Sequence, residues 1–297
     1  MPEAIDALAR PPEDPTDLHT VFGTIRRAFR EAALATPDLD ARILTTETLG
    51  ITTAQLIANP RQTVSPRAAE QLYRRAQMRV EGRSIGRIIG KRAFWSLELA
   101  LGPSSLEPRP ETEAVVELAL ELIPSEDEIT IADIGVGSGA ILLSILSECP
   151  NAYGVGLDIA PAALEDARHN AERFQLTGRT SFVAGDFAAP LAQAFDLVVS
   201  NPPYVETATI EALSPTVKDH DPRLALDGGP DGLVAYRAVF AEATRILKPG
   251  AALIVEIDPR AHDMVVAEAS RHNLEPVRRA KDLSGGIRAV ALVGPRN

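Results

Sequence analysis

Residues 131–139 read Ile-Ala-Asp-Ile-Gly-Val-Gly-Ser-Gly, an apolar run that ends in three alternate glycines. Such a run is typical of a buried strand, and glycines directly after it let the backbone amides of a strand-to-helix turn approach a ligand. The spacing, with Asp133 two residues before the first glycine, differs from the Gly-x-Gly-x-x-Gly of dinucleotide-binding turns. It favours S-adenosylmethionine, which has no pyrophosphate, over NAD. A turn kept only for packing is the alternative.

Apolar, β-prone runs recur along the chain after residue 111. Alternation of such runs with helical-period stretches predicts a mostly parallel sheet covered on both faces, an α/β fold of Rossmann-like type. The expected strands are residues 129–134, 152–159, 180–184, 195–200, 251–257 and 289–293, and the expected helices include 162–174 and 233–247.

The first third of the chain has a helical pattern instead. Apolar side chains over residues 18–29 recur at spacings of four, three and four, as on one face of an amphipathic helix. A second helix is expected over residues 39–49, and a third begins with Ser65 as its cap and Pro66 at its first position. Three arginines of the third helix are expected to form a solvated face: Arg74, Arg75 and Arg79.

These patterns divide the chain into four parts. Residues 1–16 are rich in proline and aspartate and are expected to be a flexible tail, and residues 17–84 a helical domain. Two β-prone runs, the first over residues 85–89, predict a β-hairpin linker over residues 85–104. The α/β domain is expected to occupy residues 105–297.

Composition and charge argue against several classes of protein. With 297 residues, 45% hydrophobic and 24% charged, the chain has the composition of an ordinary globular protein. The formal net charge of -11 disfavours stable nucleic-acid binding. The single cysteine, Cys149, cannot form an intramolecular disulfide, and no cysteine and histidine cluster has zinc-site spacing, so no metal is expected. The absence of a signal-peptide pattern and of a long apolar run predicts a cytoplasmic protein that does not engage a membrane.

Acidic residues follow the next two strands on the same edge of the expected sheet. Asp158 lies about 20 residues after the glycines, where an acidic residue receives ribose hydroxyls in nucleoside-binding sheets, although a helix cap is the alternative. Asp186 can accept a hydrogen bond from an adenine amino group and Phe187 can contact the purine, with a simple turn as the alternative. The predicted cofactor-binding residues are Gly135, Val136, Gly137, Ser138, Gly139, Asp158, Asp186, Phe187 and Asn201.

The most specific segment is a buried strand followed at once by Asn201-Pro202-Pro203-Tyr204. Two consecutive prolines stop the strand and hold the carbonyl groups of Asn201 and Pro202 in fixed directions. A planar amide or amino nitrogen has a delocalised lone pair, so two acceptors must hold its hydrogens and aim it at a sulfonium methyl group. We expect these two carbonyls to do so while Tyr204 packs against the planar group. No general base is needed before transfer, because the proton becomes acidic only as the new bond forms.

Over residues 38–293 the chain resembles the HemK-like family of protein glutamine-N5 methyltransferases. Besides the glycine turn and the Asn-Pro-Pro-Tyr loop, residues 108–113 are similar to the family segment that enters the cofactor domain, and residues 220–232 to the loop after Asn-Pro-Pro-Tyr. The resemblance implies a small helical domain and a hairpin before a seven-stranded class I S-adenosylmethionine-dependent methyltransferase domain. It also implies methylation of the glutamine in the Gly-Gly-Gln motif of peptide-chain release factors. Further matching segments are Phe94-Trp95 and residues 281–285.

The resemblance also assigns roles residue by residue. It implies cofactor contacts at residues 135–139 and at Asp158, Phe187 and Asn201. Because all the residues expected to face the nucleotide lie after residue 130, the helical domain is expected to recognise the protein substrate. The chain departs from the family pattern at residues 84–87, Glu107 and Asp258. The residues expected to bind the glutamine are Asn201, Pro202, Pro203 and Tyr204, of which Asn201, Pro202 and Tyr204 are the expected catalytic residues.

Two other functions are compatible with these motifs. An Asn-Pro-Pro-Tyr loop can also hold the exocyclic amino group of adenine, cytosine or guanine in RNA or DNA, but the net charge of -11 argues against such a substrate. The chain could instead be an inactive S-adenosylmethionine-binding protein. The intact Asn-Pro-Pro-Tyr loop argues against that, because cofactor binding alone does not need it.

Overall fold

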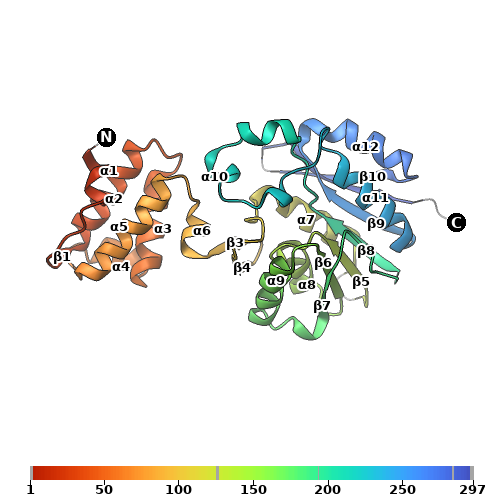
Figure 1. Cartoon of the computed structure of the whole chain (residues 1–297). Coiled ribbons are helices and arrows are strands. Elements are labelled where there is room, and N and C mark those ends of the chain that lie inside the picture. Colours follow the sequence, from red (N-terminus) through yellow and green to blue (C-terminus); the bar gives the residue numbers. More distant parts are fainter. Residues whose placement is uncertain (1–2, 125–126, 193, 283, 295–297) are drawn as a thin grey trace. The chain divides into compact units, whose positions relative to one another are not determined.

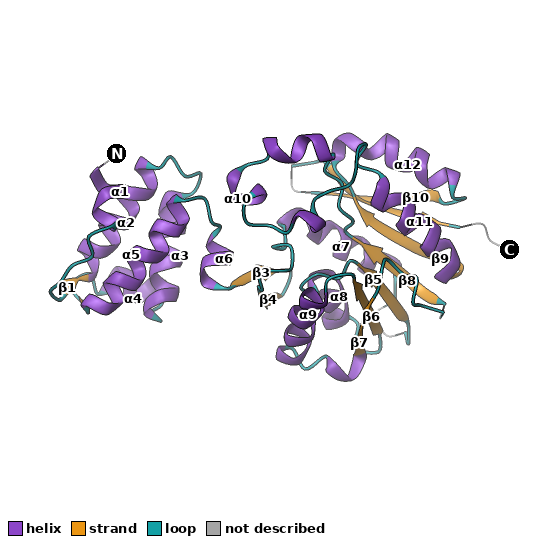
Figure 2. Ribbon diagram, in the orientation of Figure 1, coloured by secondary structure: helices purple, strands orange, loops and turns teal. Residues whose placement is uncertain are grey.

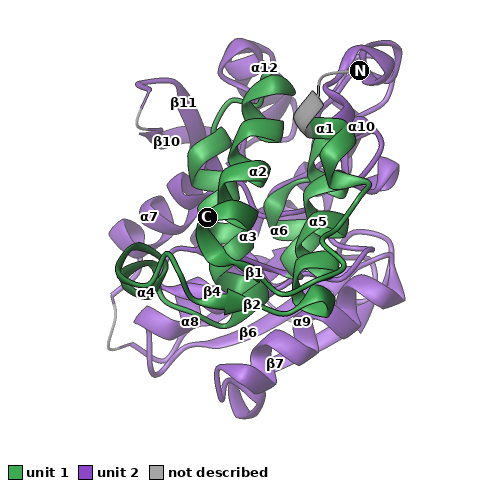
Figure 3. Cartoon of the chain, turned by 90° about the vertical axis from the view of Figure 1, so that its left-hand side faces the viewer, with its two compact units in different colours: residues 1–90 green, residues 91–297 purple. Residues whose placement is uncertain are grey.

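The computed structural model describes residues 3–124, 127–192, 194–282 and 284–294, which form two compact units (Figure 1). The first unit is Met1–Gly90 and the second is Lys91–Asn297, coloured separately in Figure 3. Each unit has an apolar core of its own. Among the described residues, no helix is both long and apolar enough to cross a membrane.

The first unit is a bundle of helices (Figure 2). Helix α2 buries one apolar face that includes Ile25 and Phe29, and the α3 helix ends at Gly50 in a left-handed conformation. The Ser65 hydroxyl accepts a hydrogen bond from the Ala68 amide and caps α5, as the sequence predicts. The elements of this unit are α1 (Glu3–Leu8), β1 (Thr16–Asp17), α2 (Leu18–Glu31), α3 (Pro37–Leu49), α4 (Thr53–Ala58), β2 (Thr63–Val64), α5 (Pro66–Val80) and α6 (Ile85–Ile89).

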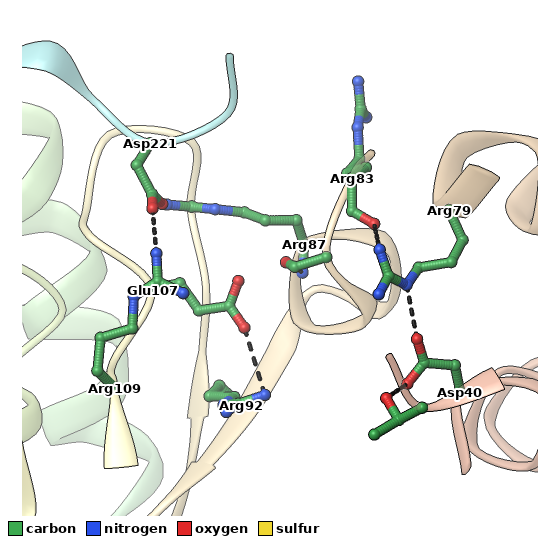
Figure 4. A network of polar contacts seen from close by, with 10 residues as sticks. Asp40, Arg79, Arg83, Arg87, Arg92, Glu107, Arg109 and Asp221 are labelled. Carbon is green, nitrogen blue, oxygen red and sulfur yellow. Dashed lines mark hydrogen bonds and ion pairs between the residues drawn. The ribbon is translucent and has the colours of Figure 1, made fainter. Parts of the chain in front are cut away.

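Two expectations for this unit are wrong. The segment of residues 1–16 is not simply a tail over its described part, because α1 buries Leu8 in the bundle core and β1 pairs with β2. Nor do all three arginines of α5 face solvent. Arg79 donates from Nε to the buried Asp40 carboxylate at 2.7 Å (Figure 4). This charge-assisted hydrogen bond offsets the cost of burying the two charged groups.

The hairpin lies later in the chain than the sequence predicts. Residues 85–89 form the helix α6 rather than a strand, since the Ser84 hydroxyl accepts from the Arg87 amide at 3.1 Å and Gly90, with a φ of 77°, ends the helix. The hairpin pairs β3 (Lys91–Phe94) with β4 (Leu97–Ala100). It therefore begins the second unit.

The second unit contains a seven-stranded sheet in the order β10-β11-β9-β8-β5-β6-β7. Strands β5 to β9 are parallel, whereas β11 runs antiparallel to both β9 and β10. The α/β class and six of the strands are confirmed, and β10 is an addition that the sequence analysis did not predict. The strands are β5 (Thr130–Ile134), β6 (Tyr153–Asp158), β7 (Thr180–Ala184), β8 (Phe195–Ser200), β9 (Leu247–Glu256), β10 (Glu275–Lys281) and β11 (Ile287–Val293).

Helices cover both faces of this sheet (Figure 2). Successive residues of a strand point to opposite faces, so Leu197 of β8 packs with α7, α8 and α9, whereas Val198 packs with α11 and α12. The helices of this unit are α7 (Glu113–Leu122), α8 (Ala140–Glu148), α9 (Pro161–Arg173), α10 (Pro215–Lys218), α11 (Val234–Ile246) and α12 (His262–Arg271).

The order of the strands reverses between β5 and β8. From β5 the chain moves outward to β6 and β7, then returns to place β8 on the other side of β5. Ile134 and Ser200 are paired at the carboxyl ends of β5 and β8, and the Ser200 hydroxyl donates to the Ile134 carbonyl at 2.7 Å. Ligands of open α/β sheets bind in the crevice at such a reversal.

Candidate active site

The glycine turn after β5 adopts a backbone that other residues rarely take. Gly135, Gly137 and Gly139 have φ angles of 79°, 54° and 84°. A Cβ added at Gly135 or Gly137 would point into open space, whereas one at Gly139 would lie 2.8 Å from Leu143. The first two glycines therefore leave backbone open to a ligand, and the third lets α8 pack closely.

Asp158, the last residue of β6, holds the tip of this turn. Its Oδ2 accepts from the Gly137 amide at 3.0 Å, and its Oδ1 accepts from the Ala160 amide at 2.9 Å. Asp158 is not the cap of α9, because Ala160 occupies that position. A carboxylate has about four acceptor positions, so two remain for ribose hydroxyls.

A cavity of about 550 Å³ opens at the turn, a size typical of small-molecule sites. Phe187 on its wall has a φ of 47°, an uncommon conformation for an aromatic residue and one found where structure is held for binding. Most of the predicted cofactor residues line the cavity: Gly135, Val136, Gly137, Ser138, Asp158, Asp186, Phe187 and Asn201. Gly139 does not line it and acts through packing.

The loop after β8 is held by glycines far along the chain. A Cβ at Gly228 would lie 2.8 Å from the Pro203 carbonyl oxygen and from the Tyr204 Cα, and one at Gly232 would lie 2.7 Å from the Tyr204 carbonyl oxygen. The Val205 and Gly228 backbones are also hydrogen-bonded at 2.8 Å. Residues 228–232 therefore pack directly against the Asn-Pro-Pro-Tyr loop and fix its course.

A second cavity, of about 640 Å³, lies on the other side of this loop. Tyr204, Glu256 and the exposed Met264 line it, together with residues of the loop at 205–233. Four residues line both cavities: Leu106, Arg109, Asn201 and Ala225. Asn201 thus stands at the boundary between a cavity bordered by the glycine turn and one bordered by Tyr204.

A buried ion pair fixes this boundary. Arg109 Nη2 contacts the Asp221 carboxylate, and nearby Arg92 pairs with Glu107 at 3.5 Å (Figure 4). Asp221 belongs to the loop after β8, and Arg109 precedes α7. Although Arg109 is only half-buried, its pair with the buried Asp221 ties these two segments together beside Asn201.

Three titratable groups near the cavities have raised pKa values: Asp133, Glu256 and Tyr204. Burial raises the pKa of Asp133, which accepts from the Leu142 amide at 3.2 Å, to about 7. Burial also raises the pKa of Glu256 to about 7. The pKa of Tyr204 rises because the phenol is buried and lies near the Glu256 carboxylate. Tyr204 therefore stays a neutral hydroxyl, whereas the two carboxyl groups titrate near neutrality.

The first cavity fits a nucleoside. It offers open backbone at Gly135 and Gly137, a carboxylate with unused acceptor positions at Asp158, and an aromatic side chain at Phe187. The first cavity meets the second at Asn201, whose Nδ2 donates to the Thr112 hydroxyl at 3.4 Å. Sequence reasoning missed Arg109, Thr112 and Glu256. A sequence signal for Glu256 did exist. Like Asp158, Glu256 is an acidic residue that ends an apolar strand at the carboxyl edge of the sheet.

This sheet order, with a glycine turn at the reversal point and an acidic residue ending the next strand, defines a class I S-adenosylmethionine-dependent methyltransferase domain. A family model described as "Methyltransferase domain" matches residues 125–280, and one described as "PrmC N-terminal domain" matches residues 22–90. The fold is shared with a methyltransferase from Pyrococcus furiosus, at a TM-score of 0.51 and 18% identity over 68% of this chain and 92% of that one.

Curated relatives are similar over most of the chain. A release factor glutamine methyltransferase of Bradyrhizobium diazoefficiens is 48% identical over 78% of this chain and 80% of its own length. Another, from Caulobacter vibrioides, is 40% identical over 88% of this chain and 91% of its own length. The chain belongs to the release factor glutamine methyltransferase family.

Proposed function

We propose that this protein transfers the methyl group of S-adenosylmethionine to the side-chain amide nitrogen of a glutamine in a peptide-chain release factor. The observation that carries the proposal is the position of Asn201 on both cavities. The family relationship supports the substrate, because the relatives are named for release factor glutamine methylation.

The residues around the first cavity would hold the cofactor. Its chemistry is the supply of a methyl group on a sulfonium centre. The open backbone at Gly135 and Gly137 would lie against the ligand, Asp158 would accept ribose hydroxyls, and Asp186 and Phe187 would receive the adenine. These residues select and place the cofactor.

The residues around the second cavity would hold the glutamine. Asn201 turns Nδ2 toward Thr112, so its side-chain carbonyl is the group that accepts from the substrate amide. The carbonyl of Pro202, a residue that lines the first cavity beside Asn201, would be the second acceptor, and Tyr204 would pack against the planar amide from the second cavity. Two fixed acceptors direct the nitrogen toward the first cavity in line with the methyl group. The proton that leaves becomes acidic only as the N–C bond forms, so no base must act first.

A parallel methylation assay tests this function. The full chain is incubated with labelled S-adenosylmethionine and, separately, with a release factor, the same factor with its Gly-Gly-Gln glutamine changed to alanine, and total RNA. We expect label only in the unaltered release factor. Label in RNA would favour exocyclic-amino methylation, and cofactor binding without any transfer would favour an inactive binding protein.

We also propose that the first unit recognises the release factor. All residues proposed to contact the cofactor lie in the second unit, after residue 130, and the first unit has a core of its own. A chain that begins at Lys91 should, once its folding is verified by circular dichroism, bind the cofactor as the full chain does and methylate a whole release factor poorly. Equal methylation by the two chains would contradict this assignment.

A further inference from the structure

We propose that Glu256 is a positioning residue that orients Asn201 and Tyr204 toward the substrate amide, acting through the Thr112 hydroxyl and the Tyr204 hydroxyl. The proposal rests on the proposed function, since it concerns how the two sides of the glutamine site are set. In this proposal Glu256 acts from the wall of the second cavity and does not itself hold the reacting amide. Its effect must therefore pass through groups that contact the substrate.

The fold places Glu256 beside the reacting loop. Val255 of β9 pairs with Ser200 of β8, so Glu256 and Asn201 are the next residues along two neighbouring parallel strands. The Tyr236 hydroxyl donates to the Glu256 carbonyl at 2.7 Å and fixes this strand end. The Glu256 side chain is buried and lines the second cavity.

Hydrogen bonding with Thr112 and with Tyr204 lowers the pKa of Glu256 against the larger, opposite effect of burial, so both hydroxyls lie beside the carboxylate. An ionised carboxylate only accepts hydrogen bonds, so Thr112 must direct its one hydroxyl proton toward Glu256. The Thr112 oxygen then accepts from Asn201 Nδ2, at 3.4 Å. This direction of donation leaves the Asn201 carbonyl for the substrate, as the transfer requires.

The Glu256 carboxylate has fewer bonding partners than a buried carboxylate with a purely structural role would have. The buried Asp40 is paired with Arg79 at 2.7 Å, whereas the described residues give Glu256 no ion pair, and its buried Oε2 has no hydrogen-bond partner among them. A buried acceptor in that state is unfavourable until a hydrogen-bond donor reaches it. Hydrogen bonds of catalytic groups are often loose before the substrate binds, and the Asn201 to Thr112 distance has this character.

Protonation of Glu256 would reverse the network. A neutral carboxyl can donate to Thr112, which can then donate to the Asn201 carbonyl, and Asn201 would present its NH₂ to the substrate NH₂. Burial raises the pKa of Glu256 to about 7, Thr112, Arg288 on β11 and Tyr204 favour the charged form, and Glu111 opposes it. The ionised form prevails above this pKa, so turnover should fall as the pH drops through it.

Single-turnover methylation of a release factor, with cofactor saturating, tests the network. Thr112→Val keeps the shape but removes the hydroxyl, and should lower the transfer rate by about tenfold or more. Thr112→Ser keeps the hydroxyl and should restore most of that rate. Glu117→Gln, an exposed carboxylate on α7, serves as the control for charge and should match the parent chain.

The pH profile separates positioning from a structural role. Glu256→Gln should lose the fall in rate on the acid side of neutrality, so that it differs from the parent most at high pH. The double variant with Thr112→Val should lose little more than the worse single variant, because both changes break one network. Parent-like rates and profiles in Thr112→Val and Glu256→Gln would overturn the proposal, as would an equal loss at every pH accompanied by a matching loss of thermal stability.

A second measurement does not require turnover. The side-chain amide resonances of Asn201, observed by ¹⁵N NMR, should shift with pH near neutrality in the parent chain and stay constant in Thr112→Val. Constant resonances in both would overturn the proposal even if no methyl transfer could be measured. If the parent chain transfers no methyl to the release factor while its Asn201 resonances do titrate, the proposed function fails and the network stands.

Discussion

The two cavities that Asn201 lines differ in the groups that form their walls. At the glycine turn the first exposes backbone: Gly135 and Gly137 leave it open, and Asp158 holds it through the Gly137 amide. The second has the side chains of Glu256 and Tyr204 in its wall. The shape of the glycine turn depends on a few local residues, whereas the wall of the second cavity joins residues as distant in sequence as Leu106 and Met264. The first should therefore govern affinity for the cofactor, and the second the rate of transfer.

The sharpest test of this division is Asn201→Ala. Loss of one oriented acceptor in a preorganised site typically lowers turnover by about 10² to 10³. Cofactor affinity should fall by about tenfold or less, because Asn201 touches the first cavity only at its edge. Single-turnover methylation and calorimetric titration measure the two effects separately. Transfer at the parent rate would end the orientation mechanism.

Asp158→Ala should give the opposite pattern. Removal of a charged acceptor of ribose hydroxyls, worth roughly 1.5–3 kcal/mol, should weaken cofactor binding by about 10- to 100-fold. Transfer from saturating cofactor should change much less. The dissociation constant is measured by calorimetry, and a folded variant with the parent's value would remove Asp158 from the site.

Gly137→Ala tests the backbone part alone. A left-handed φ of 54° should cost a residue with a Cβ roughly 1–2 kcal/mol, and the new methyl group would enter the space proposed for the cofactor. Gly178→Ala is a matched control, because Gly178 has open surroundings and no left-handed φ, and it should be neutral or stabilising by about 0.4–1 kcal/mol. Urea unfolding with and without cofactor compares them. Equal behaviour of the two variants would show that the turn does not need its conformation.

Strands buried on both faces were predictable because their apolar runs have no competing explanation. The central strand at 195–200, buried at nearly every position, falls on the predicted residues, and the partly buried edge strand at 180–184 does so as well because Phe182 and Val183 give it an apolar pair. The edge strand β10 escaped prediction because nearly all its residues are exposed and only pairing with β11 defines it. The α6 helix was missed for another reason. Its β-branched isoleucines favour a strand locally, but the Ser84 cap and the Gly90 stop decide in favour of a helix.

Site residues divide in the same way. The glycines and Asp158 were predictable because each lies directly after a strand, so sequence position alone places it on the carboxyl edge. Thr112 and Arg109 lie outside any such pattern. They reach the site only because η1 (Pro110–Thr112) packs near the end of the sheet, and the segment with Asp221 pairs with Arg109 from far along the chain. Contacts of that kind depend on tertiary structure, which no local motif records.

The wall that the two cavities share makes cofactor and substrate binding thermodynamically linked. A glutamine peptide that moves Arg109 or Asn201 also changes the wall of the first cavity, and with it the affinity for the cofactor. The factor by which one ligand alters the affinity of the other must be equal in both directions. The linkage extends to the reaction's end. Methyl transfer adds bulk to the peptide in the second cavity and removes it from the cofactor in the first, so the affinities of both products change together.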